Sequence, residues 1–132
     1  MQAVIMAGGK GTRLRPYTNI LPKPLLPLGL RSILEINIRQ LVAYGIDNII
    51  IAVGYLGELI ENVIGNGDQY GISILYSYEE KPLGTVGALS LIRDKLEDNF
   101  IVMNGDILHN VDFNALLLQH STNGTCITIT TY

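Results

Sequence analysis

A glycine-rich stretch with several basic side chains, AGGKGTRLRPYTNILPKP, occupies residues 7–24. Glycines that follow an apolar run let the backbone approach a ligand closely, because no side chain stands in the way. The lysines and arginines of the same stretch indicate that this ligand is anionic. The residues with the clearest capacity for chemistry are therefore those of an anion-binding loop, namely Gly8, Gly9, Gly11, Arg13 and Lys23.

Charge is distributed unevenly along the chain. The first 34 residues carry five basic side chains and no acidic one, a local charge of +5, and since the net charge is -3 the remaining residues carry -8. The acidic total argues against general binding of nucleic acid. A compact positive region beside glycines is typical of a site for a small phosphorylated ligand.

Spacing separates three phosphate-binding designs that begin with a strand and a glycine turn. The sequence GGKGTR does not fit the mononucleotide P-loop, G-x-x-x-x-G-K-[ST]. The dinucleotide fingerprint G-x-G-x-x-G fits Gly9 and Gly11 but then meets Leu14, and the second strand lacks the acidic residue that would hold a ribose. A nicotinamide-dependent oxidoreductase is therefore the weaker alternative. The third design is a loop whose successive backbone N–H groups wrap a triphosphate.

Two later segments add polar groups after strand-like runs. Asp106 follows the apolar residues 100–103, which puts its carboxylate at the carboxyl end of a predicted central strand, where α/β sheets bind ligands. The segment EEKPLGTVGAL, residues 79–89, follows another such run. Its Gly84 and Thr85 stand at a predicted helix start, where backbone N–H groups are available to a ligand.

Strand-like apolar runs alternate with amphipathic stretches over the whole chain. Strands are predicted at residues 3–7, 48–53, 73–78, 100–103 and 126–132. Helices are predicted from a cap at Ser32 to Gly45, at 57–64, from a cap at Thr85 to Leu96, and from a cap at Asp112 over 113–119. This order predicts a doubly wound, Rossmann-like α/β fold, a mainly parallel sheet with helices on both faces.

The last predicted strand, CITITTY, has high β propensity and no charge, and no helix follows it. We therefore interpret residues 1–132 as the nucleotide-binding part of a larger domain, with the single Cys126 buried on that strand. An uncovered apolar strand also predicts self-association into a homo-oligomer.

Composition limits the class of protein further. The chain is 48% hydrophobic and 16% charged, as in a globular domain with a filled core. Neither a membrane-spanning run nor a secretory signal is evident, so a cytoplasmic location and no membrane partner are expected. One cysteine and two scattered histidines give neither an internal disulfide nor a zinc site.

Several motifs together carry a resemblance to a known family. AGGKGTRLRPYT with PKPLLPLG resembles the signature of the sugar-phosphate nucleotidyltransferases, enzymes that join a nucleoside triphosphate and a sugar 1-phosphate into a nucleotide sugar and pyrophosphate. YGIDNIIIAVGYLGELI, NGDQYGISILYSYEEKPLGTVGAL and FIVMNGDIL resemble later segments of the same family, in the same order. The resemblance covers nearly the whole chain.

The resemblance implies roles for individual residues. Arg13 would hold the β and γ phosphates, Lys23 would bridge toward the reacting phosphates, and Asp106 would hold Mg²⁺ against the α-phosphate. The nucleotide-binding residues that it implies are Ala7, Gly8, Gly9, Gly11, Thr12, Glu79, Pro82, Gly84 and Thr85. The family's sugar pocket and a second metal-binding aspartate would lie beyond position 132.

The base of the nucleotide follows less directly from the sequence than the phosphate site does. Glu79 and Glu80 only accept hydrogen bonds, and the Watson–Crick edge of guanine presents two adjacent donors. GTP with mannose 1-phosphate is therefore the first choice, since the segment also looks like that of mannose-1-phosphate guanylyltransferases. UTP or dTTP with glucose 1-phosphate is the alternative, and a non-catalytic nucleotide-sensing module or regulatory subunit is a rival of another class.

Overall fold

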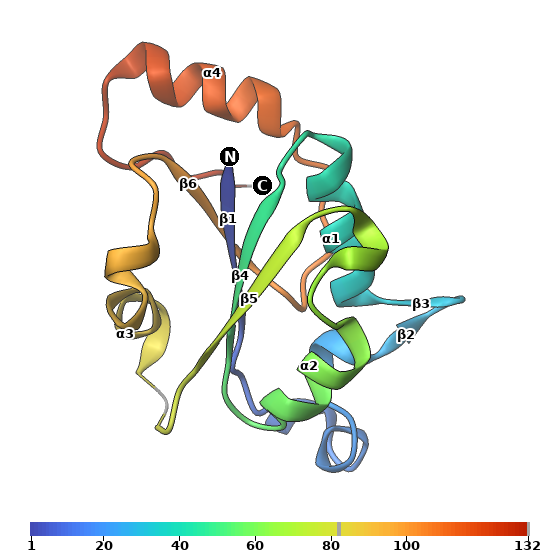
Figure 1. Cartoon of the computed structure of the whole chain (residues 1–132). Helices are drawn as coiled ribbons and strands as arrows, with labels where there is room; N and C mark the ends of the chain where they lie inside the picture. Colours follow the sequence, from blue (N-terminus) through green and yellow to red (C-terminus); the bar gives the residue numbers. More distant parts are fainter. Residues whose placement is uncertain (82, 132) are drawn as a thin grey trace.

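Parallel strands form the main sheet of the structure, a computed structural model that describes residues 1–81 and 83–131. The strands are β1 (Gln2–Ala7), β4 (Asn48–Val53), β5 (Ser73–Tyr78) and β6 (Phe100–Asn104), in the order β5-β4-β1-β6 (Figure 1). They confirm the first four predicted strands to within a residue. β6 was expected to be central, but it forms an edge of the sheet within the described residues.

β1 and β4 form the middle of the sheet because their side chains are apolar on both faces. Ile5 lies opposite Ile51 in the parallel register, and both are fully buried. Val4 and Ile50 are just as buried on the other face. Such continuous apolar strands require a cover on both sides, which is the pattern of doubly wound sheets.

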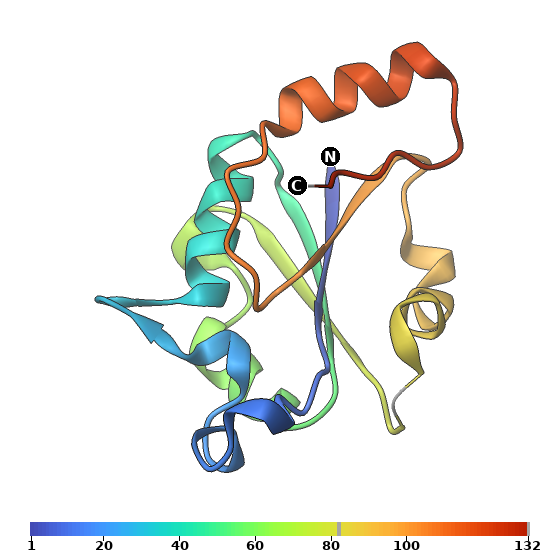
Figure 2. The same ribbon diagram turned by 180° about the vertical axis from the view of Figure 1, so that it is seen from behind.

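Helices provide that cover on both faces, which confirms the predicted fold class. α1 (Ile33–Ala43) and α2 (Gly57–Ile64) lie on one face, and α3 (Gly84–Leu91) lies on the other (Figures 1 and 2). The predicted cap of α1 is present, because the Ser32 hydroxyl accepts a hydrogen bond from the Glu35 backbone N–H at 3.2 Å. Gly45, with φ 78°, takes the left-handed conformation just after the helix ends.

The two faces of the sheet differ in the size of the hydrophobic core that they bury. The α1 and α2 face holds the larger core, in which Leu34, Ile38 and Ile60 pack on the strands. The α3 face holds a small cluster of three buried residues, Val4, Ile50 and Ile92. The first face therefore carries most of the buried apolar surface that stabilises this chain.

α3 differs from its prediction at both ends. It begins at Gly84, with Leu83 at the cap position, so Thr85 lies inside the first turn and does not cap the helix. It ends at Leu91 and continues as a separate 3₁₀ turn, η5 (Arg93–Lys95). A glycine with φ 70° at residue 84 lets the chain turn into the helix, a conformation that sequence spacing does not reveal.

Short elements link β1 to α1 and carry three of the basic residues, Arg13, Lys23 and Arg31. They are η1 (Thr12–Leu14), η2 (Tyr17–Asn19), η3 (Lys23–Leu25) and a small hairpin of β2 (Pro27–Leu28) and β3 (Arg31–Ser32). Pro24 and Leu25 of η3 are buried. Burial of these two residues ties the lysine between two prolines to the core.

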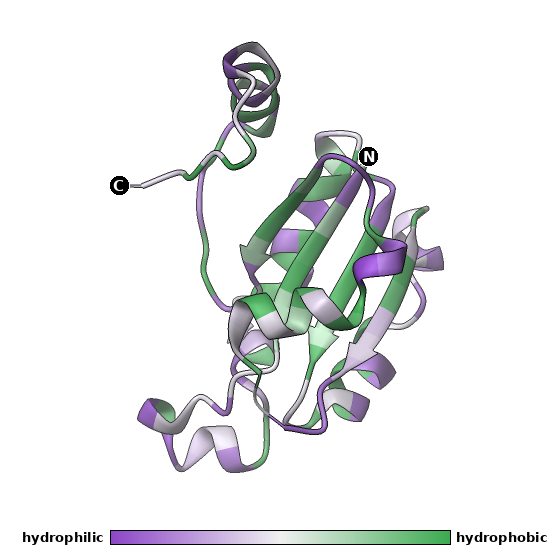
Figure 3. Ribbon diagram, turned by 90° about the vertical axis from the view of Figure 1, so that its left-hand side faces the viewer, coloured by the Kyte–Doolittle hydropathy of each residue, from purple (hydrophilic) through white to green (hydrophobic). Residues whose placement is uncertain are grey.

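The end of the chain departs from the prediction. α4 (Phe113–Asn123) has the predicted cap, since the Asp112 carboxylate accepts from the Ala115 backbone N–H at 3.1 Å, but no strand follows within residues 126–131. Cys126 is exposed there, not buried on a strand. Figure 3 shows α4 and the segment after it standing away from the sheet. High β propensity does not form a strand when no neighbouring strand pairs with it.

Among the described residues, every helix is too short or too polar to span a bilayer.

Candidate functional site

A cavity of about 360 Å³ opens at the carboxyl ends of β1 and β6. The chain runs from β1 to β4 and β5 on one side, and β6 returns to the other side of β1. Neighbouring strands whose connections leave in opposite directions create a crevice, which is where open α/β sheets bind ligands. The cavity therefore lies where the sequence predicted the site.

Glycines form the part of the cavity that follows β1. Gly8, Gly9 and Gly11 line it, together with Ala7 at the end of the strand. Gly11 has φ 57°, and a Cβ atom on it would lie 2.9 Å from the methyl carbon of Thr18. Only glycine satisfies both the conformation and the space at this position. The loop thus brings backbone, without side chains, to the edge of the cavity.

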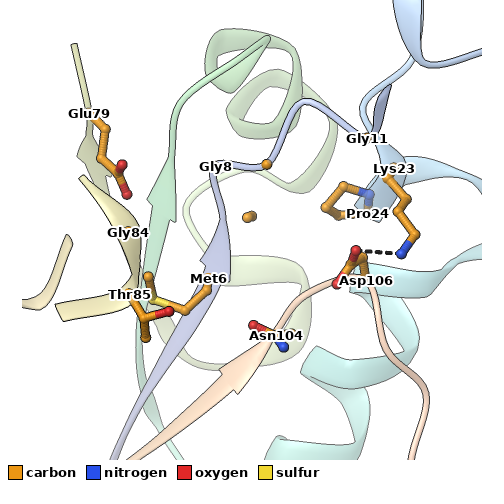
Figure 4. Close-up of a pocket in the computed structure, with 12 residues that line it drawn as sticks. Met6, Gly8, Gly11, Lys23, Pro24, Glu79, Gly84, Thr85, Asn104 and Asp106 are labelled. Carbon is orange, nitrogen blue, oxygen red and sulfur yellow. Dashed lines mark hydrogen bonds and ion pairs between the residues drawn. The ribbon is translucent and has the colours of Figure 1, made fainter. Parts of the chain in front are cut away.

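Two oppositely charged side chains meet on one side of the cavity. The Lys23 ammonium donates a hydrogen bond to Oδ2 of Asp106 at 2.6 Å, across 83 positions of sequence (Figure 4). Lys23 comes from η3 and Asp106 from the loop after β6. We call Lys23, Pro24, Asn104 and Asp106 the lysine–aspartate wall.

The opposite side of the cavity comes from the other edge of the sheet, that of β5. Glu79 follows β5, and Gly84 and Thr85 open α3; we call these three residues the glutamate wall (Figure 4). One carboxylate oxygen of Glu79 accepts a hydrogen bond from the Leu83 backbone N–H at 3.2 Å. The other lies 3.4 Å from where a Cβ on Gly8 would stand, so Glu79 leans toward the glycine loop.

One titratable group near the lysine–aspartate wall has a shifted pKa. Burial lowers the pKa of His109 below its ordinary value, because the charged imidazolium loses hydration there. The ring packs edge-on against Phe113, with the ring centres 5.3 Å apart. His109 therefore packs within the loop after Asp106.

The structure gathers most of the predicted site residues. Those that line the cavity are Ala7, Gly8, Gly9, Gly11, Lys23, Glu79, Gly84, Thr85 and Asp106. Arg13 and Thr12 lie on η1, exposed to solvent, and do not line it. Pro82 lies outside the described residues.

Three lining residues were not predicted as binding or catalytic residues from the sequence. Met6 precedes the glycine loop on β1, Pro24 follows Lys23, and Asn104 ends β6. Asn104 and Pro24 belong to the same sequence motifs as Asp106 and Lys23. Their position beside these two residues was the signal that could have identified them as lining residues. Met6 belongs to an apolar run, where nothing distinguishes a residue at a cavity edge from a core residue.

A metal ion at this site would need ligands in addition to those of the described residues. Among the described residues, no three carboxylate, histidine or cysteine side chains come together to hold one. Asp106 fits a hard cation, since Oδ1 has no hydrogen-bond partner in the described part of the chain and only Oδ2 is engaged by Lys23. Magnesium is commonly held by one or two carboxylates with substrate phosphates and water, and this donor set is compatible with that arrangement.

Comparisons with known proteins agree on one family. The family model described as nucleotidyl transferase matches residues 2–132. The mannose-1-phosphate guanylyltransferase catalytic subunit beta of Danio rerio is 41% identical over 128 residues, which are 94% of this chain and 36% of that protein. A UTP–glucose-1-phosphate uridylyltransferase of Synechocystis is 35% identical over 143 residues, 99% of this chain and 37% of that protein.

The fold is shared with solved structures as well. The crystal structure of HddC from Yersinia pseudotuberculosis, complexed with GMP-PN, superposes with a TM-score of 0.81 and 28% identity, over 90% of this chain and 53% of that one. This chain spans about a third of the length of the two relatives above. Because the family model covers the chain almost from end to end, the chain belongs to the nucleotidyl transferase family.

Proposed function

We propose that this chain supplies the nucleotide site of an enzyme that joins a nucleoside triphosphate and a sugar 1-phosphate, giving a nucleotide sugar and pyrophosphate. One observation carries the proposal. The glycine loop, Lys23 and Asp106 come from three separate segments and line one cavity at the switch point of the sheet. A backbone anion site beside an ammonium and a carboxylate suits a polyphosphate with its metal ion.

The proposed reaction is a nucleotidyl transfer. A phosphate oxygen of the sugar 1-phosphate attacks the α-phosphorus of the nucleotide, a new P–O bond forms, and the bond to the β-phosphate oxygen breaks with its electrons on pyrophosphate. Two polyanions must come together and charge builds on the leaving group, so positioning and cations matter more than a nucleophilic side chain. Lys23 supplies a cation, and the glycine loop supplies N–H donors.

Asp106 is the proposed ligand of Mg²⁺, which would neutralise phosphate charge when bound. In the structure the same carboxylate is paired with Lys23 at 2.6 Å. Lys23 thus holds the carboxylate at the cavity edge and orients it before a metal ion arrives. The role of Arg13 at the β and γ phosphates stays a prediction, and it requires the exposed guanidinium to turn toward the cavity.

GTP is the proposed nucleotide, with mannose 1-phosphate as the proposed acceptor. Glu79 supports this choice because its carboxylate lines the cavity and can accept from the two adjacent donors of guanine. Glu80 is exposed and does not line the cavity. UTP or dTTP with glucose 1-phosphate is the second candidate, since a uridylyltransferase is among the relatives.

A thermal-shift panel tests the proposal. The chain is heated with GTP, UTP, dTTP, CTP or ATP, each with and without Mg²⁺, because a ligand that binds the folded state raises its unfolding temperature. We expect the largest shift with GTP and Mg²⁺. A second assay measures pyrophosphate release with mannose 1-phosphate and with glucose 1-phosphate. Binding without turnover by any pair would favour either the nucleotide-sensing module or a sugar pocket that lies beyond position 132, and the absence of any shift would overturn the nucleotide site.

A further inference from the structure

Asn37 is a polar residue on the buried face of α1. Its exposure is 0%, as is that of Leu34, Ile38 and Leu41 on the same face. A carboxamide removed from water loses free energy unless it makes hydrogen bonds in the protein. An apolar residue would fill this position without that loss, so the amide requires an explanation.

The Asn37 side chain reaches the loop that carries Asp106. Its Nδ2 donates to the backbone carbonyl of Ile107 at 3.1 Å and lies 3.5 Å from the carbonyl of Gly105. These two carbonyls flank Asp106 in the sequence. The amide nitrogen must face them, because the amide oxygen would be repelled by both acceptors. The oxygen, Oδ1, is buried and has no partner among the described residues.

The other side of the same loop is fixed to β1. The Gly105 N–H donates to the Met6 carbonyl at 2.9 Å. A Cβ on Gly105 would lie 2.9 Å from the side chain of Ile5 and 3.5 Å from that of Leu34, so the backbone packs directly between β1 and α1. The loop is thus held from two elements, and the Asp106 side chain is left facing the cavity (Figure 4).

We propose that Asn37 is a positioning residue: through the carbonyls on either side of Asp106, it holds that carboxylate in the orientation that receives a divalent cation with the nucleotide. This inference rests on the proposed function. The physical reason is that a cation with strict ligand geometry binds poorly to a carboxylate whose backbone moves. The unsatisfied Oδ1 of Asn37 lowers the stability of the fold, and the compensating benefit is the fixed position of Asp106 at the cavity.

The test compares Asn37→Leu and Asn37→Ala with the wild-type chain. Leucine refills the volume and alanine leaves a void, so an effect that both share belongs to the lost amide. Mn²⁺ binding is titrated by electron paramagnetic resonance with GTP, or with UTP or dTTP if one of these binds the wild type more tightly. Nucleotide affinity without metal and amide hydrogen exchange of Gly105 without metal are measured alongside.

We expect both variants to weaken Mn²⁺ binding about tenfold, as loss of a residue behind a metal ligand typically does, and to accelerate exchange of the Gly105 amide. Metal-free nucleotide affinity should stay unchanged. Ile38→Val is the matched control, because it trims the same buried face of α1 and keeps the Asn37 amide. It should lower stability and leave Mn²⁺ affinity as it is.

Three results would overturn the inference. Wild-type Mn²⁺ affinity in the Asn37 variants would remove the positioning role and leave the proposed function intact. An equal loss in Ile38→Val would assign the effect to the stability of α1. A wild-type chain that binds no Mn²⁺ with any of the three nucleotides would overturn the proposed metal site together with this inference. If Asn37→Leu does not fold, Asn37→Ala carries the comparison.

Discussion

The two walls of the cavity are built differently. The lysine–aspartate wall is tied to the larger core, because Pro24, Leu25 and Gly105 are buried behind Lys23 and Asp106. The glutamate wall stands on the start of α3, a helix in which Ala88 is the buried residue. Gly84 and Thr85 on that wall are exposed. The first wall is therefore the more firmly supported.

This difference in support by the core fits the two kinds of contact that we propose for the walls, contacts to phosphate and metal on one and contacts to the base on the other. Charges and metal ligands need fixed distances, because electrostatic energy and coordination geometry both depend on them. Hydrogen bonds to a base select among ligands and need less support from the core. Substitutions on the lysine–aspartate wall should therefore act on turnover with every nucleotide. Substitutions on the glutamate wall should act on the choice of nucleotide.

The largest expected effect is at the ion pair. Lys23→Met and Asp106→Asn should each lower kcat/KM for nucleotidyl transfer by about 100-fold or more, whichever nucleotide is used, because each removes a charge beside the reacting phosphates. Pyrophosphate release measures this. Lys10→Met is the control, since Lys10 is exposed and does not line the cavity. An equal loss in Lys10→Met would mean that general positive potential, not the wall, drives turnover.

Two glycines of the loop allow effects on stability and effects on nucleotide binding to be tested separately. Gly11→Ala should lower the free energy of unfolding by about 1–2 kcal/mol from its positive φ alone, before the contact with Thr18 is counted. Gly9→Ala should leave stability unchanged, because a Cβ there meets nothing within 4 Å. It should still weaken nucleotide binding about tenfold, since a methyl group keeps phosphate away from the backbone. Denaturant unfolding and nucleotide titration of both variants distinguish the two effects, and Gly9→Ala with unaltered affinity would exclude phosphate contact at that residue.

Glu79→Gln tests the glutamate wall. We expect the preference for GTP over UTP to fall about tenfold, because a neutral amide loses a charge-assisted hydrogen bond to guanine. The turnover of bound nucleotide should stay close to the wild-type rate. Ratios of kcat/KM for the two nucleotides measure this, with Glu80→Gln as the exposed control. Unchanged preference in Glu79→Gln would remove the base contact from this wall.

The smallest expected effect is a pH dependence beside the lysine–aspartate wall. Burial lowers the pKa of His109 in the folded chain, so the unfolded chain binds a proton more readily. The stability contributed by neutral His109 is present above the unfolded pKa of about 6.5 and is lost as pH falls through the lower folded value. His109→Phe should make the unfolding midpoint less sensitive to pH between 7 and 5. A wild-type slope in that variant would assign the dependence to other groups.

Local chemistry made much of the fold predictable. Ser32 and Asp112 cap their helices as their spacing indicates, and the first four predicted strands formed. Thr85 was assigned as a cap wrongly, because Gly84 with positive φ starts the helix and Leu83 takes the cap position, two residues before Thr85. The final predicted strand failed for a different reason. A strand needs a neighbouring strand with free backbone groups in register. The β propensity of residues 126–131 does not indicate whether such a neighbour is present.

The candidate site was predictable where a motif names its residues, and not where a contact joins distant segments. Glycine positions, proline-flanked Lys23 and the aspartate after an apolar run could be read directly, since each reflects a constraint within a few residues. Arg13 belongs to the same motif, yet it projects from η1 outside the cavity. A long flexible side chain is directed by the turn that carries it, which a motif does not specify.

Residue order was enough to define strands, helix caps and bare glycines, because these follow from the conformational preferences of neighbouring residues. The folded arrangement alone set β6 beside β1 and so brought Asp106 to Lys23 across 83 positions. It also directed Asn37, a polar residue on an apolar helix face, at the loop behind that aspartate. Such contacts arise from the packing of whole elements, in which each residue's partner depends on how the rest of the chain is buried.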